Sequence, residues 1–252
     1  MLPTSIVVGI LLAIAALLIA APAAEVDLFR LLGSVGQLIE FLGLMLAVPD
    51  WGYLPDLLIK MLQTIEIAFV STFMALVVSL PLGVLAASNT SPHPLVYHFT
   101  RNLMNLMRAL PEFIWALVFV SAVGLGALPG VMALAFVTTG FMSKFFAESI
   151  EVIDPKAVEG LTSTGAGQFQ ILMFAVLPQA LPDFISTILY ILDLNIRSAT
   201  VLGLVGAGGI GYDMVMAMRL FNYNRLVMIA VCIYLAVTFL DRLSDKFRGR
   251  VI

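Results

Sequence analysis

Long apolar runs, separated by short polar intervals, dominate this sequence. Six runs can be distinguished, at residues 5 to 22, 59 to 88, 108 to 127, 130 to 149, 181 to 204 and 225 to 242. Each is close to the ~20 apolar residues that a helix needs to cross the hydrocarbon core of a bilayer. A helix also pairs its own backbone amides and carbonyls, which water cannot do inside a membrane. The pattern therefore predicts an all-α membrane protein with about six transmembrane helices.

The segment from 25 to 58 differs from these runs because charged residues are mixed with its leucines. They are Glu25, Asp27, Arg30, Glu40, Asp50 and Asp56. Such a mixture is typical of a helix that lies along the membrane interface rather than crossing it. We therefore divide the chain into residues 1 to 58, an N-terminal span plus this interfacial segment, and residues 59 to 252, the membrane core.

The first run also has the apolar core of a signal peptide, and Ala21-Pro-Ala-Ala-Glu25 after it is similar to a cleavage site. A signal peptide begins with positively charged residues, and none precedes this run. We therefore expect the segment to be retained as a first span.

Composition agrees with the membrane interpretation and excludes several functions. Hydrophobic residues make up 61% and charged residues 12% of the chain, against roughly a quarter charged in soluble domains. The net charge of −3 and the absence of a dense basic patch argue against nucleic-acid binding. The single cysteine, Cys232, excludes an intramolecular disulfide and a cysteine metal cluster. His93 and His98 share one polar loop, and we predict no metal site.

The distribution of basic residues predicts the orientation. With the N-terminus inside, eight basic residues lie in cytoplasmic segments: Arg101, Arg108, Lys144, Lys156, Arg242, Lys246, Arg248 and Arg250. Four lie outside: Arg30, Lys60, Arg219 and Arg225. Because cytoplasmic loops carry the excess of Lys and Arg, both termini and the loop around Glu159 are predicted to be cytoplasmic.

That loop, from about 154 to 178, has the signals of a helix–turn–helix elbow. Asp154 is suited to cap a helix that begins at Pro155, since its oxygen accepts free amides and proline lacks the donor. Further signals divide the rest of the loop: a short helix over 157 to 164, a turn at Gly165 and Gly167, a helix over 168 to 175, and a bend at Pro178 and Pro182. A structured loop between membrane spans indicates a docking surface for a soluble partner.

The spacing in the elbow resembles the motif of ABC-importer permeases, Glu-Ala-Ala, three residues, a glycine and, further on, Leu-Pro. Here Glu159-Gly160-Leu161, Gly165 and Leu177-Pro178 take these places. Gly160 and Leu161 replace alanines, and Ala175 stands where a larger aliphatic residue is usual. The competing interpretation is an ordinary amphipathic loop.

The resemblance extends over residues 60 to 245 and points to the phosphonate/phosphite branch of these permeases. The segments that carry it are Gly124-Leu-Gly126 with Pro129-Gly130, Gly140 to Glu148, Asn195 to Gly203, and Gly206-Ala-Gly-Gly-Ile-Gly211. It implies a type I ABC importer permease fold with a cytoplasmic coupling helix. The implied function is that of a membrane subunit importing phosphonate, phosphite or a related reduced-phosphorus oxyanion. The alternative is a permease for another small solute, such as an amino acid, a metal or another anion.

The resemblance also implies partners in a bacterial inner membrane. Cytoplasmic ATPase subunits would dock at Lys156, Glu159, Gly160 and Gly165, a second permease copy or paralogue would complete the pathway, and an outer binding protein would deliver the solute. The sequence contains no Walker loop, so ATP and magnesium are expected in the ATPase and no cofactor in this chain. Nor does it offer a catalytic arrangement, which argues against an enzyme.

Charged residues inside apolar runs are costly and mark pathways or ion pairs. Asp193 and Arg197 lie four positions apart, so one interpretation is an internal ion pair. The other is that Arg197, with Asn195 and Ser198, lines the pathway and attracts an oxyanion, which its planar guanidinium suits. Glu112 is expected to form an ion pair or an interface near the cytoplasmic end of its span.

Gly206, Gly208 and Gly211 satisfy a Gly-x-Gly-x-x-Gly pattern, and Gly209 lies among them. A dinucleotide site would also need a preceding strand and a following acidic residue, and this context is missing. We predict that the four glycines form a hinge or outer gate after the fifth span. An alternative is that their amides contact a passing anion.

Overall fold

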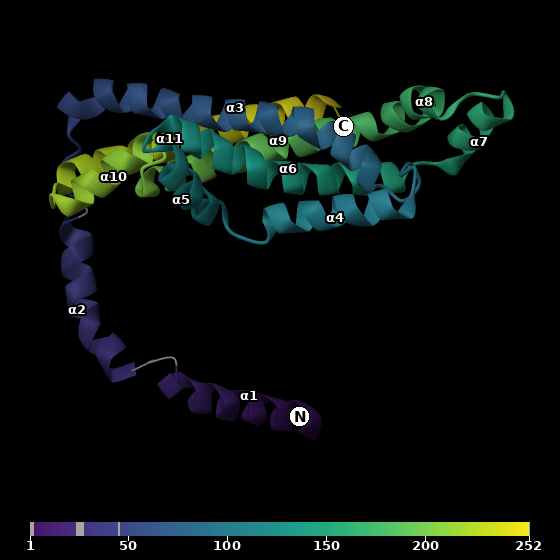
Figure 1. Ribbon diagram of the computed structural model, residues 1–252. Coiled ribbons are helices and arrows are strands. Elements are labelled where there is room, and N and C mark those ends of the chain that lie inside the picture. Colours follow the sequence, from purple (N-terminus) through teal and green to yellow (C-terminus); the bar gives the residue numbers. More distant parts are fainter. Residues whose placement is uncertain (1–2, 24–27, 45, 252) are drawn as a thin grey trace. The chain divides into compact units, whose positions relative to one another are not determined.

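The computed structural model describes residues 3–23, 28–44 and 46–251, and the regular structure in these ranges is entirely helical (Figure 1). The chain divides into two compact units, residues 1–47 and 48–252. The first unit contains α1 (Thr4–Ala23) and α2 (Leu28–Leu44). The first apolar run is thus a helix of 20 residues.

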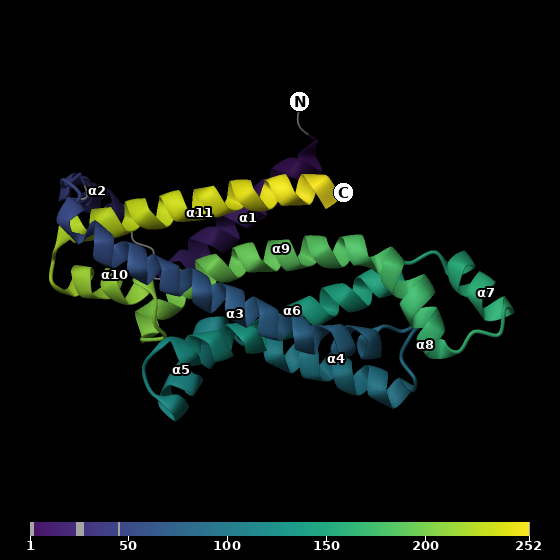
Figure 2. The same ribbon diagram turned by 90° about the horizontal axis from the view of Figure 1, so that it is seen from above.

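The second unit contains all elements that build the candidate sites. In chain order they are the 3-10 turn η1 (Trp51–Tyr53), α3 (Leu54–Ala86), α4 (Pro94–Arg108), α5 (Glu112–Val123), α6 (Ala127–Glu151), α7 (Pro155–Ser163), α8 (Gln168–Ile171), the π turn η2 (Leu172–Val176), α9 (Leu177–Leu202), the 3-10 turn η3 (Gly203–Val205), α10 (Ile210–Arg219) and α11 (Tyr223–Val251). Helix α6 packs against α3, α4, α5 and α9. Figure 2 shows α7 and α8 at one end of this unit and α10 at the other.

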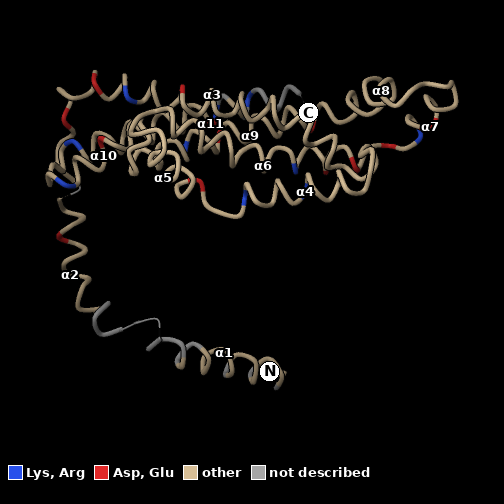
Figure 3. Tube along the Cα trace, in the orientation of Figure 1, with Lys and Arg blue, Asp and Glu red and all other residues tan. Residues whose placement is uncertain are grey.

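Four of the predicted runs form continuous spans within the described ranges. Helices long and apolar enough to cross a bilayer lie within residues 51–86, 127–151, 168–205 and 223–242. Uncharged residues make up most of the trace of α3, α6 and α9 between their ends (Figure 3). The first of these spans begins before residue 59, so the end of the predicted interfacial segment belongs to a spanning helix. Glu25 and Asp27 of that segment lie outside the described residues.

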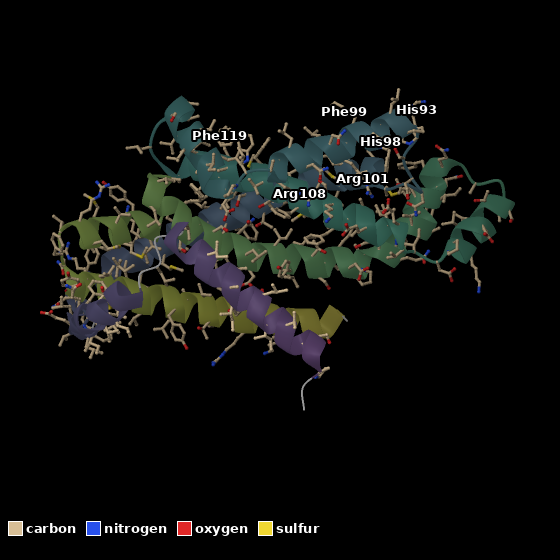
Figure 4. The ribbon with its side chains drawn as sticks, turned by 90° about the horizontal axis from the view of Figure 1, so that it is seen from below. His93, His98, Phe99, Arg101, Arg108 and Phe119 are labelled. Atoms are coloured by element: carbon tan, nitrogen blue, oxygen red, sulfur yellow. The ribbon has the colours of Figure 1, made fainter. Side chains whose placement is uncertain are left out.

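The predicted run over 108 to 127 is not one spanning helix. Helix α4 ends at Arg108, α5 begins at Glu112, and their axes differ by 84°. Pro111 explains the break, because proline disfavours helical geometry in the residue before it and donates no amide hydrogen bond. Helix α5 has 12 residues, about 18 Å of helix, which is too short to span alone. Figure 4 shows side chains along α4 and, on α5, Phe119; those labelled on α4 are His93, at its N-cap, His98, Phe99, Arg101 and Arg108.

Small residues on α3 explain how closely the central helices pack. Its buried face repeats every three to four positions and carries mainly Thr, Ser, Ala and Gly: Thr64, Ala68, Ser71, Thr72, Ala75, Ser79, Gly83 and Ala86. A Cβ added to Gly83 would lie 2.8 Å from Cβ of Phe146 in α6. Small side chains allow such close approach where lipid provides no hydrophobic driving force between helices. Ser79 also donates across this interface to the carbonyl oxygen of Thr139, at 3.2 Å.

Candidate functional site

The elbow begins as the sequence predicts. Oδ1 of Asp154 accepts the amide of Lys156 at 2.9 Å, and Pro155 is the first residue of α7. Gly165, just after the helix, has φ +80°, a conformation that favours glycine. The backbone N–H of Asp154 donates to Oε1 of Gln179 at 3.1 Å, which ties the start of the elbow to α9.

The second half of the elbow differs from the prediction in three respects. Gly167 has φ −74° and caps α8, so no left-handed turn needs it. The expected helix over 168 to 175 consists of α8 followed by the π turn, in which the amide of Leu177 bonds to the carbonyl of Leu172. Pro178 and Pro182 lie inside the first turns of α9 and mark no sharp bend. The π turn ends just before Pro178. A proline is tolerated at the start of a helix because the amides of the first turn have no helical partner, so its missing amide hydrogen costs no hydrogen bond.

The four predicted docking residues are accessible on the elbow. Lys156, Glu159, Gly160 and Gly165 are all exposed. Apolar side chains accompany them on the second arm of the elbow: Phe169, Met173 and Phe174 are exposed, Phe169 by 69%. An exposed mixture of apolar and charged groups on one protruding element is typical of a protein-binding surface.

An ion pair braces the helices behind the elbow. Arg101 in α4 contacts Oε1 of Glu151 at 2.8 Å and donates to the carbonyl oxygen of Ala86 at 3.0 Å. Glu151, at the C-terminus of α6, also accepts the amide of Ser88 at 2.7 Å. These contacts therefore join the C-terminal ends of α3 and α6 to α4. Glu151 lies three residues before Asp154, where the elbow begins.

A groove runs along α6 and α9. Its most enclosed part, about 290 Å³, is lined by Glu112, Leu134, Val137, Thr138, Phe141, Phe145, Tyr190, Ile191, Leu194, Asn195 and Ser198. Two shallower hollows continue it toward the elbow, and they share Phe145, Ser186 and Thr187. The last hollow is also lined by Glu148 and Asp183. The groove is thus apolar in bulk, with hydroxyl, amide and carboxylate groups at intervals.

Asn195 is the centre of a buried polar chain across three helices. Its Oδ1 accepts the hydroxyl of Thr138 in α6 at 2.9 Å, and its Nδ2 donates to Thr72 in α3 at 2.8 Å. Asn195 is 5% exposed. A buried amide without such partners would be costly, so this network fixes its orientation at the wall of the groove.

Glu112 and Ser198 meet at the other end of the same cavity. The hydroxyl of Ser198 in α9 donates to Oε1 of Glu112 in α5 at 2.8 Å. The expected ion pair of Glu112 is therefore replaced by a hydrogen bond. The sequence places Ser198 three residues after Asn195 on one helical face, but nothing in it indicated that Glu112 would join them.

Arg197 lies on a different face of α9 from Asn195 and Ser198. It contacts Asp193 at 2.6 Å and Asp241 of α11 at 3.0 Å, and it is absent from the lining of the cavity. Two positions apart on a helix correspond to about 200° of rotation, so Asn195 and Arg197 cannot face the same groove. The predicted ion pair forms, with a second carboxylate that the sequence did not reveal.

The four predicted gate glycines lie in the tight connection between α9 and α10. Gly206, Gly208 and Gly209 have φ values of +81°, +83° and +76°. L side chains rarely adopt this region. The connection therefore follows a path that depends on glycine.

The same connection is closely packed. A Cβ on Gly208 would lie 2.9 Å from Cα of Ala127, and one on Gly209 would lie 2.6 Å from Oγ1 of Thr64. Gly211 approaches the backbone of α9 with similar closeness. Close packing accounts for these glycines in this conformation, and movement as a gate stays a prediction.

Comparison with known proteins identifies the family. The family described as the inner membrane component of binding-protein-dependent transport systems matches residues 79–252. The chain belongs to this family. It is accordingly a multi-pass membrane component of a transport system, and the elbow, the groove and the glycine connection all lie within or beside the matched region.

Two relatives indicate the branch of the family. The phosphite transport system permease protein PtxC of Stutzerimonas stutzeri is 40% identical over 200 residues, covering 79% of this chain and 73% of the relative. The phosphate-import permease protein PhnE of Mycolicibacterium smegmatis is 41% identical over 197 residues, 78% of this chain. This chain spans only 37% of the length of that second protein.

Solved structures agree on the fold. The inward-facing MetNI methionine ABC transporter matches with a TM-score of 0.70 and 23% identity, over 81% of this chain and 99% of that chain. The predicted type I importer permease fold is therefore confirmed.

Proposed function

We propose that this chain forms one half of the translocation pathway of an ATP-driven importer for phosphonate, phosphite or a related reduced-phosphorus oxyanion. The observation that carries the proposal is the 40% identity with a phosphite permease over most of both chains. The second amide hydrogen of Asn195 and the phenol of Tyr190 on the cavity wall support it, because they can donate to an oxyanion without forming a tight cage. Weak, sequential contacts suit a solute that must leave as well as enter.

The pathway needs a second wall. The described groove is lined by α5, α6 and α9 of one chain. A second copy of this permease, or a paralogue, would face it and enclose the solute. The membrane is the bacterial inner membrane, with both termini in the cytoplasm.

The elbow is the element through which ATP would act. Cytoplasmic ATPase subunits, which bind the ATP and magnesium, would receive Lys156, Glu159, Gly160 and Gly165. Nucleotide-driven closure would move the elbow, and the brace of Arg101 would carry that movement into α4. This chain itself would catalyse no reaction.

The opposite end of the unit would open to the outside. A periplasmic or extracellular binding protein would deliver the solute there, next to the connection of Gly206, Gly208, Gly209 and Gly211. Small changes in this close-packed connection would open or close the pathway.

One observation favours a second candidate, a permease for a solute that carries a positive charge. Glu112 places a carboxylate on the cavity wall, and the fold is shared with a methionine transporter. An ammonium group would pair with that carboxylate directly.

ATP hydrolysis by the reconstituted complex distinguishes the candidates. We expect stimulation by the partner binding protein loaded with phosphite or methylphosphonate, and none when methionine is offered. Stimulation by an amino acid alone would contradict the proposal. When uptake is measured on the same proteoliposomes, Glu159→Ala should abolish the coupling of hydrolysis to uptake, while Asp56→Ala, at an exposed carboxylate outside the elbow and the groove, should keep it.

A further inference from the structure

The charged side chains along the groove are acidic. Glu112 lies at one end, and Glu148 and Asp183 at the other; no lysine or arginine is among the described residues that line it. A pathway for an anion would be expected to present positive charge. The groove therefore needs a different way of accommodating a negatively charged solute.

Three basic residues on the helices that line the cavity or pack beside it are already engaged. Arg108 in α4 donates to Asn105 at 2.6 Å and lies over the ring of Phe141, 5.5 Å from its centre. Lys144 in α6 pairs with Glu148 at 3.4 Å. Arg197 in α9 is held by its two aspartates. The other titratable group on the cavity wall is the phenol of Tyr190.

Glu112 is placed to accept hydrogen bonds in the cavity. It lies in the first turn of α5 and on the cavity wall. Its Oε1 takes the hydroxyl of Ser198. Its other oxygen, Oε2, receives no hydrogen bond from the described residues, and it can accept a proton donor from a solute in the cavity.

We propose that Glu112 selects the singly protonated form of the oxyanion by accepting a hydrogen bond from its P–OH group. This inference rests on the proposed function. A monoprotonated phosphonate or phosphite offers one donor to Glu112, and its remaining oxygens accept from Tyr190 and from the second amide hydrogen of Asn195. A fully deprotonated anion of the same shape has no donor, so its oxygen faces the carboxylate oxygen without a proton between them.

The geometry also predicts which anions are rejected at this point of the pathway. Sulfate has the tetrahedral shape of these solutes and carries no proton at neutral pH. A site built to accept a hydrogen bond rejects an analogue that lacks the donor more strongly than one that differs in size. Glu112 therefore acts as a specificity-determining residue in addition to the binding protein.

The test compares Glu112→Gln with the wild type in proteoliposomes that contain the complete complex. Uptake of phosphite is measured across the pH range of the second ionisation of the solute, and each point is expressed as the ratio of variant to wild type. The binding protein is the same in both preparations, so its own pH dependence cancels. Gln retains an acceptor for Ser198 and adds a donor for a deprotonated oxygen.

We expect this ratio to rise by about tenfold as the solute loses its second proton, since one hydrogen bond to a charged group is worth at least that factor. Repeating the series with methylphosphonate, whose second ionisation occurs at a different pH, should move the rise accordingly. Asp56→Asn, which changes an exposed carboxylate in the first turn of α3 outside the groove, should give a flat ratio. A flat ratio for Glu112→Gln would overturn the inference.

A second variant is needed in case Glu112→Gln assembles poorly. Glu112→Ala also removes the carboxylate but adds no donor, so its ratio should rise in the same direction by a smaller factor. If the wild type transports none of these anions, the proposed function itself fails, which is a different outcome from a flat ratio in an active transporter.

Discussion

Thr64 in α3 accepts the backbone amide of Ile210, the first residue of α10, at 2.9 Å. Thr64 is fully buried, and its own hydroxyl donates to the carbonyl oxygen of Lys60 at 2.9 Å. The N-cap position of α10 is Gly209, which has no side chain to satisfy a free amide. A residue from another helix therefore caps α10 and fixes it against α3.

Removing this cap should destabilise the protein without changing its shape. Thr64→Val is similar in volume but leaves the buried amide of Ile210 unpaired, which costs on the order of 2 kcal/mol. For a chain of this size that corresponds to a decrease in melting temperature of about 4–8 °C. Thermal unfolding in detergent measures it, and Thr64→Ser, which keeps the hydroxyl, is the control. Equal melting temperatures for the Val variant and the wild type would contradict the role of the cap.

Two glycine substitutions should have opposite outcomes. Gly208→Ala forces a side chain into a left-handed conformation and against Ala127, so we expect little assembled protein. Gly160→Ala adds a methyl group on the exposed elbow, where no other atom lies within 4 Å. That variant should assemble normally, as size-exclusion chromatography would report. Normal assembly of both would mean that the connection tolerates a different backbone path.

The brace behind the elbow should affect energy coupling. Arg101→Ala releases the ends of α3 and α6 from α4, so ATP hydrolysed per solute imported should increase. The control is Lys144→Ala, because Lys144 pairs with Glu148 within α6 and joins no second helix. Hydrolysis and uptake are measured on the same proteoliposomes. If both variants kept the wild-type ratio, the brace would be only a local contact.

We expect Arg197 to have a structural role rather than a role in the translocation pathway. Arg197→Gln leaves Asp193 and Asp241 together without their cation, and we expect a lower melting temperature. Asp193→Asn in the same chain should restore part of the loss, because one of the two facing charges is removed. Solute selectivity should be unchanged in the double variant. A stable Arg197→Gln protein with altered selectivity would instead support a pathway role.

The sequence predicted features that depend on local chemistry. The cap at Asp154, the start of α7 at Pro155 and the ion pair of Asp193 with Arg197 all involve residues within four positions of each other. Such patterns are set by helix geometry, which is independent of the rest of the fold.

Features that depend on tertiary packing were not predictable in this way. Asp241 reaches Arg197 across 44 positions, and Ser198 reaches Glu112 across 86. Hydropathy alone gave one continuous run over Pro111, where the structure has a break between α4 and α5. Where a helix ends and which partner a side chain finds both depend on residues that are distant in the sequence and close only in the folded structure.

The central claim is that this permease carries reduced-phosphorus oxyanions at the expense of ATP. Uptake of labelled phosphite by proteoliposomes containing the permease, its ATPase and its binding protein tests it most directly, with methylphosphonate, phosphate and methionine as unlabelled competitors. We predict uptake that requires ATP and is reduced by the phosphorus oxyanions but not by methionine. Phosphite uptake that is absent, independent of ATP, or abolished by methionine would contradict the account.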